Sequence, residues 1–355
     1  MIKIESYGKE WINSHRSREG FERINPPLAE KMFHSLGLVE LLALEGLDFI
    51  FKGGTSLILL LDSPGRFSID IDIITRSERN VIEETLAKIC NGKPFTNFKL
   101  QERRSYKEGI PKAHYALLYN STLTGKEDNI LLDILYDDHP YPSVLKKPIL
   151  TEWLLTDDNP VLVQVPSHES ITGDKLTAFA PGTTGILYKT GKELEIIKQL
   201  FDLGRLYHEI EEIATVGQAF SKTAQKEIEY RGKQFSMNDV ITDIMETALL
   251  IANREKNKNE PDLSNFKELR FGLLQFKAYQ TNSFFRIEEA ITAAAKAALL
   301  AASIRAGKKG AVNIYDPSIK KTDYLIRDAK YNFLNRLQPE PLYYWHKTIQ
   351  LLSEQ

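Results

Sequence analysis

The chain has 355 residues, of which 42% are apolar and 26% are charged, and its formal net charge is −2. This composition is ordinary for a globular protein, and the length predicts two domains at roughly 100–200 residues each. Dedicated nucleic-acid-binding proteins often carry a strong basic excess, so any nucleic-acid contact here would need a local patch. The single cysteine, Cys90, excludes an intrachain disulfide and a cysteine-based zinc site.

The hydropathy of the chain predicts a protein of the cytoplasm. Residues 1–17 are polar and mixed in charge, unlike a secretory signal peptide. No apolar run approaches the roughly 18 residues that span a membrane.

The first half of the chain mixes helices and strands. Apolar residues recur at helical spacing over 28–39, and a short strand at 49–51 leads through Gly53 and Gly54 into a helix with Thr55 as its N-cap. Residues 66–76 alternate with period two and predict a strand, and Ser77 then opens a helix. Further strands are expected at 98–107, 113–122, 129–138 and 161–165.

From residue 167 the pattern is helical almost to the end, with helices expected at 167–180, 192–211, 217–231, 237–255 and 283–306. The strands are not separated one by one by helices, so the sheet should be mixed or antiparallel, and a doubly wound dinucleotide-binding fold is disfavoured. We therefore expect an α+β fold with a mixed domain over 1–166 and a mainly helical domain over 167–355.

Two aspartates stand in the expected strand "RFSIDIDII", residues 66–74. Because side chains alternate across a strand, Asp70 and Asp72 share one face, about 7 Å apart, while Phe67, Ile69, Ile71 and Ile73 share the other. Like charges so placed repel unless something positive compensates, and Mg²⁺ prefers such oxygen ligands. The plainer alternative is a solvated polar face.

A third carboxylate, Asp133, interrupts the apolar run "LLDIL" on a later expected strand. A lone buried acid is unfavourable unless it is paired or binds a metal, although it can also cap a turn. Together with Asp70 and Asp72 it would form a cluster able to organise two metal ions for phosphoryl or nucleotidyl transfer.

The stretch "KGGTSL" joins a strand to a helix fifteen residues before the first of the paired aspartates. Gly53 and Gly54 would let the backbone approach a phosphate, and the Thr55 and Ser56 hydroxyls would add donors at the helix start. The stretch matches neither the P-loop nor the G-x-G-x-x-G pattern, and any strand–turn–helix can use such a turn.

These motifs in this order resemble the DNA polymerase beta-like nucleotidyltransferase superfamily. "FKGGTSLILLL…GRFSIDIDII" is similar to the AbiEii/AbiGii nucleotidyltransferase toxins, which are related to the MenT toxins, and "SITGDKLTAF" and "KQLFDLGRL" look like their later motifs. The resemblance covers about residues 30–210. It implies a mixed or antiparallel nucleotidyltransferase core with flanking helices, followed by a helical C-terminal domain.

The resemblance also implies roles for individual residues. Asp70, Asp72 and Asp133 would bind two Mg²⁺ ions, with action of Asp133 as the base toward the acceptor hydroxyl as the alternative role. Lys175 would neutralise the leaving pyrophosphate, and Asp202 would be the late acid of the last motif. The residues implied to hold the nucleoside triphosphate are Gly53, Gly54, Thr55, Ser56, Lys189, Lys192 and Lys198.

Structural alternatives exist for three of these residues. Lys175 can be a surface lysine in an ion pair along its helix, and Lys198 and Asp202 stand four residues apart, a spacing that allows a structural salt bridge. Arg66 is a further candidate for pairing with an aspartate or a phosphate.

For the whole protein, the resemblance implies a metal-dependent toxin enzyme that transfers a nucleotide from a nucleoside triphosphate to RNA, with the 3′ end of transfer RNA as the expected acceptor. It also implies an AbiEi-type antitoxin partner, a type IV toxin–antitoxin system and a role in abortive infection. Two alternatives stay open: a nucleotidyltransferase with a small-molecule acceptor, as in aminoglycoside nucleotidyltransferases, and a nucleotide-binding toxin that acts without transfer.

Basic and aromatic residues alternate over 101–115, where Arg103, Arg104, Lys107 and Lys112 stand among tyrosines. Such interleaving suits RNA contact, and it equally suits a charged hairpin edge that discourages aggregation.

Overall fold

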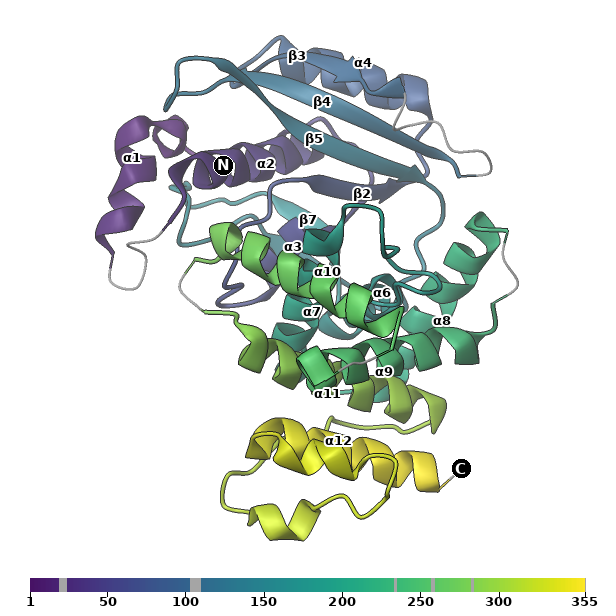
Figure 1. Ribbon diagram of the computed structural model, residues 1–355. Coiled ribbons are helices and arrows are strands. Elements are labelled where there is room, and N and C mark those ends of the chain that lie inside the picture. The colour runs from purple at the N-terminus through teal and green to yellow at the C-terminus, as the bar shows by residue number, and fades with distance from the viewer. Residues whose placement is uncertain (19–23, 103–109, 233–234, 257–258, 282–283, 355) are drawn as a thin grey trace. The chain divides into compact units, whose positions relative to one another are not determined.

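The computed structural model describes residues 1–18, 24–102, 110–232, 235–256, 259–281 and 284–354. Within these residues the chain divides into two compact units (Figure 1). The first, the sheet unit, comprises Met1–His139, Val144–Ser167 and Ala278–Ser283, and the second, the helical unit, comprises Pro140–Ser143, His168–Lys277 and Phe284–Gln355. The sequence predicts a single boundary at 166/167, whereas these units also exchange two short segments.

The helices and strands, in chain order, are α1 (Lys9–Ser14), α2 (Pro26–Leu44), β1 (Ile50–Lys52), α3 (Gly53–Leu60), β2 (Ile71–Thr75), α4 (Arg79–Cys90), β3 (Phe95–Leu100), β4 (Lys112–Asn120), β5 (Glu127–Tyr136), β6 (Val144–Pro148), β7 (Leu162–Pro166), α6 (His168–Ala178), α7 (Glu193–Leu206), α8 (Ile213–Tyr230), α9 (Met237–Asn253), α10 (Asp262–Phe276), α11 (Ile287–Arg305) and α12 (Pro339–Ser353). None of the described helices is long and apolar enough to cross a membrane.

The described strands form one mixed sheet in the order β3-β4-β5-β2-β1-β7-β6. Strands β2 and β5 run parallel, as do β1 and β7, and the other neighbours are antiparallel. The expected α+β class with a mixed sheet is therefore confirmed. The sheet places β2, which carries Asp72, between β5 and β1, and the expected strand list lacked only the edge strand β6.

Strand β2 is shorter than the sequence predicts. Its ladder runs over Ile71–Thr75 rather than 66–76, and Ile73 and Ile74 are both buried, so the period-two pattern ends inside the strand. Just before it, the Phe67 amide donates to the carbonyl of Tyr279 at 2.7 Å. A later segment of the chain thus occupies the backbone groups that the prediction assigned to the sheet.

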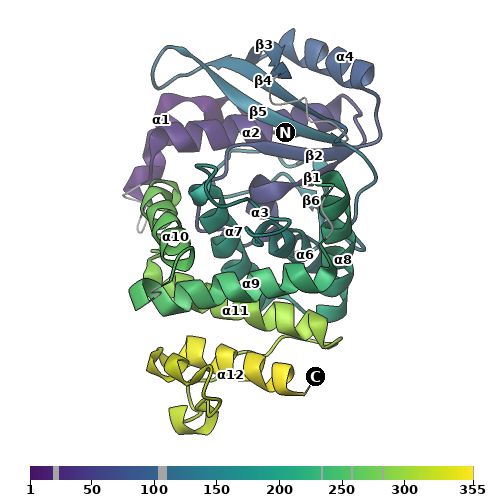
Figure 2. The ribbon, with the colours of Figure 1, turned by 45° about the vertical axis from the view of Figure 1, so that its right-hand side comes forward.

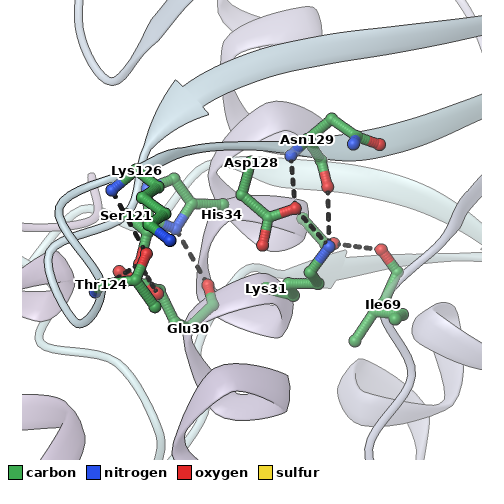
Figure 3. Close-up of polar contacts among 10 residues, drawn as sticks. Glu30, Lys31, His34, Ile69, Ser121, Thr124, Lys126, Asp128 and Asn129 are labelled. Carbon is green, nitrogen blue, oxygen red and sulfur yellow. Dashed lines mark hydrogen bonds and ion pairs between the residues drawn. The ribbon is translucent and has the colours of Figure 1, made fainter.

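Polar contacts fix helix α2 against the β4–β5 hairpin (Figure 3). The buried Glu30 carboxylate accepts hydrogen bonds from Ser121 Oγ at 2.7 Å and from Thr122 Oγ1 at 2.9 Å. Further along α2, Lys31 Nζ donates to Asp128 Oδ1 at 2.6 Å. Since a buried carboxylate needs such partners, this end of the hairpin is held in register, and β5 carries Asp133 into the site.

The helical unit is built around α11, whose run of alanines allows close packing. Helix α11 packs against α7, α9 and α12, and α6 packs against α8 (Figure 2). The expected helices correspond to α6, α7, α8, α9 and α11, with ends that differ by a few residues. Helices α10 and α12 were not expected. Each lacks a strongly helical run of residues such as "AAAKAALLAA".

Candidate active site

Four polar side chains lie in one row across adjacent strands of the sheet. The pairing places His114 of β4 opposite Asp133 of β5, Asp133 beside Asp72 of β2, and Asp72 opposite Lys52 of β1. Paired residues on neighbouring strands point to the same face, and the strands are about 4.8 Å apart. Asp72 and Asp133 are therefore neighbours, as expected, and Lys52 and His114 lie on either side of them.

The glycine turn lies directly against Asp72. Gly53 begins helix α3 immediately after β1 and has a φ of 77°, in the left-handed region that glycine adopts without strain. A Cβ added to Gly53 would overlap the Asp72 carboxylate. The glycine turn and the aspartate strand, which the sequence predicts to cooperate, are thus in contact.

Gly54 lies against a buried arginine. A Cβ at this position would overlap the guanidinium of Arg66 and crowd the Ser68 hydroxyl. Arg66 is 5% exposed, and its Nη1 donates to the carbonyl of Phe67 at 2.9 Å. The structure therefore places a cation beside the turn, which suits anion binding there.

The two hydroxyls after the glycines are buried and hydrogen bonded within the protein. Thr55 Oγ1 donates to the carbonyl of Asp70 at 2.6 Å and lies 2.9 Å from Ser68 Oγ, while Ser56 Oγ donates to the carbonyl of Gly53 at 3.0 Å. The predicted N-cap role of Thr55 is wrong, because α3 starts at Gly53 and Thr55 lies inside its first turn. The Thr55 hydroxyl instead links the start of α3 to Asp70, the residue just before β2.

The carboxylate oxygens of the site fit a hard divalent cation, but fewer carboxylates lie together than the sequence predicts. No group of three or more Asp, Glu, His and Cys side chains able to hold a metal occurs among the described residues. Asp70, Asp72 and Asp133 are therefore not gathered as one ligand set. Asp72 and Asp133 are neighbours on parallel strands, and Mg²⁺ is commonly held by one or two carboxylates together with substrate phosphates.

His114 is a site residue that the sequence analysis missed. Its Nδ1 lies 2.5 Å from Asp133 Oδ1, and its side chain is 12% exposed. An ionised carboxylate only accepts, so the ring nitrogen donates and fixes the orientation of Asp133. The local pattern gives no signal for this pairing, because it depends on the register of β4 against β5, which sets Ala113 opposite Ile134.

In the helical unit, Lys175 of α6 and Asp202 of α7 form a buried ion pair. Their atoms Nζ and Oδ2 are 2.6 Å apart, with side chains 5% and 2% exposed, and Lys175 Nζ also donates to Gln199 Oε1 at 3.3 Å. The alternative of a surface lysine is therefore wrong for Lys175. Lys198 contacts Glu195 at 2.8 Å, one turn earlier on α7.

The glycine-rich loop before α7 is held by contacts within the helical unit. The Asp243 carboxylate accepts from the Gly182 amide and from Thr183 Oγ1, both at 2.8 Å. Burial raises the pKa of Asp243 to about 6, although these hydrogen bonds act to lower it. The amide of Lys189 donates to the Glu268 carboxylate at 2.8 Å.

Two further predictions concern exposed basic residues. The side chains of Lys189 and Lys192 are exposed, so their predicted phosphate contacts stay a prediction. Of the basic stretch over 101–115, residues 103–109 lie outside the described residues. Tyr115, one of its aromatics, is buried in β4 and donates to Glu83 Oε1 at 2.9 Å, so it cannot stack on a base.

Comparison with known proteins supplies the family. Residues 38–300 match the family described as "Nucleotidyl transferase AbiEii toxin, Type IV TA system". The chain is similar to the crystal structure of JHP933 from Helicobacter pylori, with 18% identity, a TM-score of 0.43, and coverage of 79% of this chain and 93% of that one. No curated protein sequence matches significantly.

A second crystal structure, of an antigenic nucleotidyltransferase-like protein from Paracoccidioides brasiliensis, matches with 16% identity and a TM-score of 0.32, covering 57% of this chain and 91% of that one. The protein is of the nucleotidyltransferase class. Since the family match spans most of its length, the chain belongs to the AbiEii toxin family of type IV toxin–antitoxin systems.

Proposed function

We propose that the protein transfers a nucleoside monophosphate from a nucleoside triphosphate to a hydroxyl of RNA, with the 3′ end of transfer RNA as the expected acceptor. The acceptor oxygen forms a bond to the alpha phosphorus, the bond from that phosphorus to the bridging oxygen breaks, and pyrophosphate leaves. The observation that carries the proposal is the contact between the glycine turn at Gly53 and Asp72, with Asp133 in the same row.

The chain's own residues have separable tasks in this proposal. The backbone at Gly53 and Gly54 receives the phosphates, and the positive end of α3 and the Arg66 guanidinium offset their charge. Asp133, oriented by His114, either takes the proton of the acceptor hydroxyl or serves as a cation ligand.

Asp72 and Asp133 are the residues that would hold Mg²⁺, with Asp70 as the third candidate. When bound, the cation supplies charge stabilisation to the transferring phosphate. The roles predicted for Lys175, Asp202, Lys189, Lys192 and Lys198 rest on the family resemblance. The buried pair supports only that Asp202 holds the Lys175 ammonium in place.

Membership of the family supports a biological role as the toxin of a pair. We propose that the protein acts in the cytoplasm, that it arrests growth during abortive infection, and that an AbiEi-type antitoxin counteracts it.

The test is transfer of label from each of the four nucleoside triphosphates, labelled at the alpha phosphate, to total RNA in the presence of Mg²⁺. Wild type is expected to label RNA of transfer-RNA size, and Asp72→Asn is expected to lower the rate by about 1000-fold, as for loss of a group central to charge stabilisation. Asp62→Asn is the matched control, because Asp62 is an exposed aspartate of the same unit.

Other outcomes identify the alternatives. Label on an aminoglycoside, with none on RNA, would replace the RNA acceptor by a small molecule. Nucleotide binding with no transfer to any acceptor would identify a toxin that acts by binding alone.

A further inference from the structure

The helical unit contains a cavity of about 300 Å³ at one side of α10. Five of its lining residues, from Phe266 to Lys277, recur at helical spacing and so form one stripe along α10 and the turn that follows it. The start of α11 and Arg254 complete the lining. The lining residues are Arg254, Phe266, Arg270, Leu273, Leu274, Lys277, Phe285, Arg286 and Ile287.

The charged residues that line this cavity all carry the same sign. They are Arg254, Arg270, Lys277 and Arg286, and none of the described lining residues is acidic. Arg254 also contacts Glu288 at 3.0 Å, so part of its charge is offset. Arg270, Lys277 and Arg286 are exposed to solvent. Four cations that line one small cavity create a positive potential in it, which favours the binding of an anion.

The rest of the lining is apolar and partly aromatic. Phe266 and Phe285 are 2% and 6% exposed and form the floor, whereas Leu274 is 53% exposed at the side. Binding sites for small ligands combine such an apolar lining with a few polar groups, and their volumes begin at about 300 Å³. The occupant should therefore be small, apolar on one side and anionic on the other.

The geometry points to a nucleotide-binding site in this cavity, in which a phosphate lies among Arg270, Lys277 and Arg286 and the base or sugar packs on the apolar lining at Leu274. Three of the four cations are arginines, whose planar guanidinium matches phosphate oxygens and stacks on bases. The ligand is a single nucleotide unit, either free or within an RNA strand. The inference goes beyond the proposed function, because binding here requires no transfer chemistry.

Fluorescence anisotropy with a short, labelled, single-stranded RNA tests the site in the full-length protein. The measurement uses an Asp72→Asn background without Mg²⁺ or nucleoside triphosphate, so that a failure of binding is separate from a failure of transfer. We expect Arg270→Gln combined with Lys277→Gln to weaken binding at least tenfold. The slope of log affinity against log salt should also fall by up to about 0.7, the contribution of one single-strand phosphate.

Lys267→Gln is the matched control, because Lys267 is an exposed cation of α10 that does not line the cavity. It should change the affinity by less than about twofold, as expected for a surface charge outside the site. If the double variant does not fold by thermal unfolding, Arg286→Gln is expected to show a loss of several fold on its own.

Competition identifies the source of the nucleotide. Displacement of the RNA by AMP but not by adenosine supports a site for a free nucleotide, and displacement only by unlabelled RNA supports a site for a strand. Unchanged affinity in both variants would overturn the inference. So would equal competition by oligoglutamate, since the cavity would then be a site for acidic peptides.

Discussion

Asp72 in the sheet unit and Asp202 in the helical unit are both predicted to act in catalysis, and the protein packs them differently. Asp72 is half-buried, with Gly53 against it and Asp133 beside it. Asp202 is buried and has its cation, Lys175, within the fold at 2.6 Å. Asp72 and Asp133 are therefore placed to bind a ligand, whereas Asp202 already binds a cation of the protein, Lys175. We expect substitutions to affect activity in the first region and stability in the second.

The largest effect is expected for Asp202→Ala, which leaves the Lys175 ammonium buried without its carboxylate. Breaking a buried pair from one side lowers the free energy of unfolding by about 3–5 kcal/mol. Urea denaturation measures this loss. The double variant Lys175→Met with Asp202→Leu removes both charges, and it should recover most of the stability.

Glu195→Ala is the control for this prediction, because Glu195 forms the more exposed ion pair of α7 with Lys198. Its loss should stay within about 1 kcal/mol. An Asp202→Ala variant as stable as wild type, but inactive, would show that the pair serves chemistry rather than packing.

The second prediction concerns Asp243, which holds the glycine-rich loop of the helical unit. Its pKa is raised from 3.8 to about 6, so its contribution to stability is complete below pH 4 and is lost as the pH rises to about 6. Asp243→Asn removes this dependence. Its free energy of unfolding, relative to wild type, should therefore rise by up to about 3 kcal/mol between pH 4 and pH 7.

Thermal unfolding at a series of pH values measures this difference. Glu268→Gln is the comparison variant, because Glu268 holds the other end of the same loop through the Lys189 amide. If Asp243→Asn and wild type change in parallel with pH, the carboxyl of Asp243 does not titrate as its burial implies.

The sequence predicts the parts of the fold that depend on local patterns. Helices α6, α7, α8, α9 and α11 follow from apolar periodicity, and β4 and β5 from apolar runs between turn signals. The start of β2 at Ile71 rather than at residue 66 was not predictable. The Phe67 amide donates a hydrogen bond to the carbonyl of Tyr279, more than two hundred positions later in the chain. Pairing over such separations leaves no trace in a local pattern.

The same division applies to the site. Asp72, Asp133 and the glycine turn were predicted from motif order, and the pairing of strands brings them together. His114 was missed because its role depends on the register of β4 against β5, which spacing alone does not give. The burial of Lys175 against Asp202 was not predicted, because the sequence of one helix does not reveal which of its residues a second helix, α7, covers.

The third prediction tests the sheet unit through His114, a positioning residue for Asp133. His114→Ala should lower the transfer rate and raise the Mg²⁺ requirement by about 10–100-fold, as for other partners of metal-binding side chains. His114→Asn can present an amide nitrogen near the place of Nδ1, so it should retain more activity. A purely structural role would instead lower the stability of both variants and leave the Mg²⁺ requirement unchanged.

The prediction with the smallest expected effect compares two glycines in the left-handed region. It distinguishes the effect of backbone strain from that of a clash with Asp72. Gly53 and Gly191 have φ values of 77° and 70°, so the backbone strain of alanine at either position should lower the free energy of unfolding by about 1–2 kcal/mol. Only at Gly53 would the new methyl group meet the Asp72 carboxylate, since nothing lies within 4 Å of a Cβ at Gly191.

Nucleotide transfer should therefore fall in Gly53→Ala and stay close to the wild-type rate in Gly191→Ala, under conditions in which chemical denaturation shows that both variants are folded. Gly191 belongs to the loop before α7, where the predicted phosphate contacts Lys189 and Lys192 also stand. An equal loss of activity in the two variants would mean that the loop takes part in catalysis as closely as the turn against Asp72 does. The contrast between a reactive sheet unit and a structural helical unit would then be wrong.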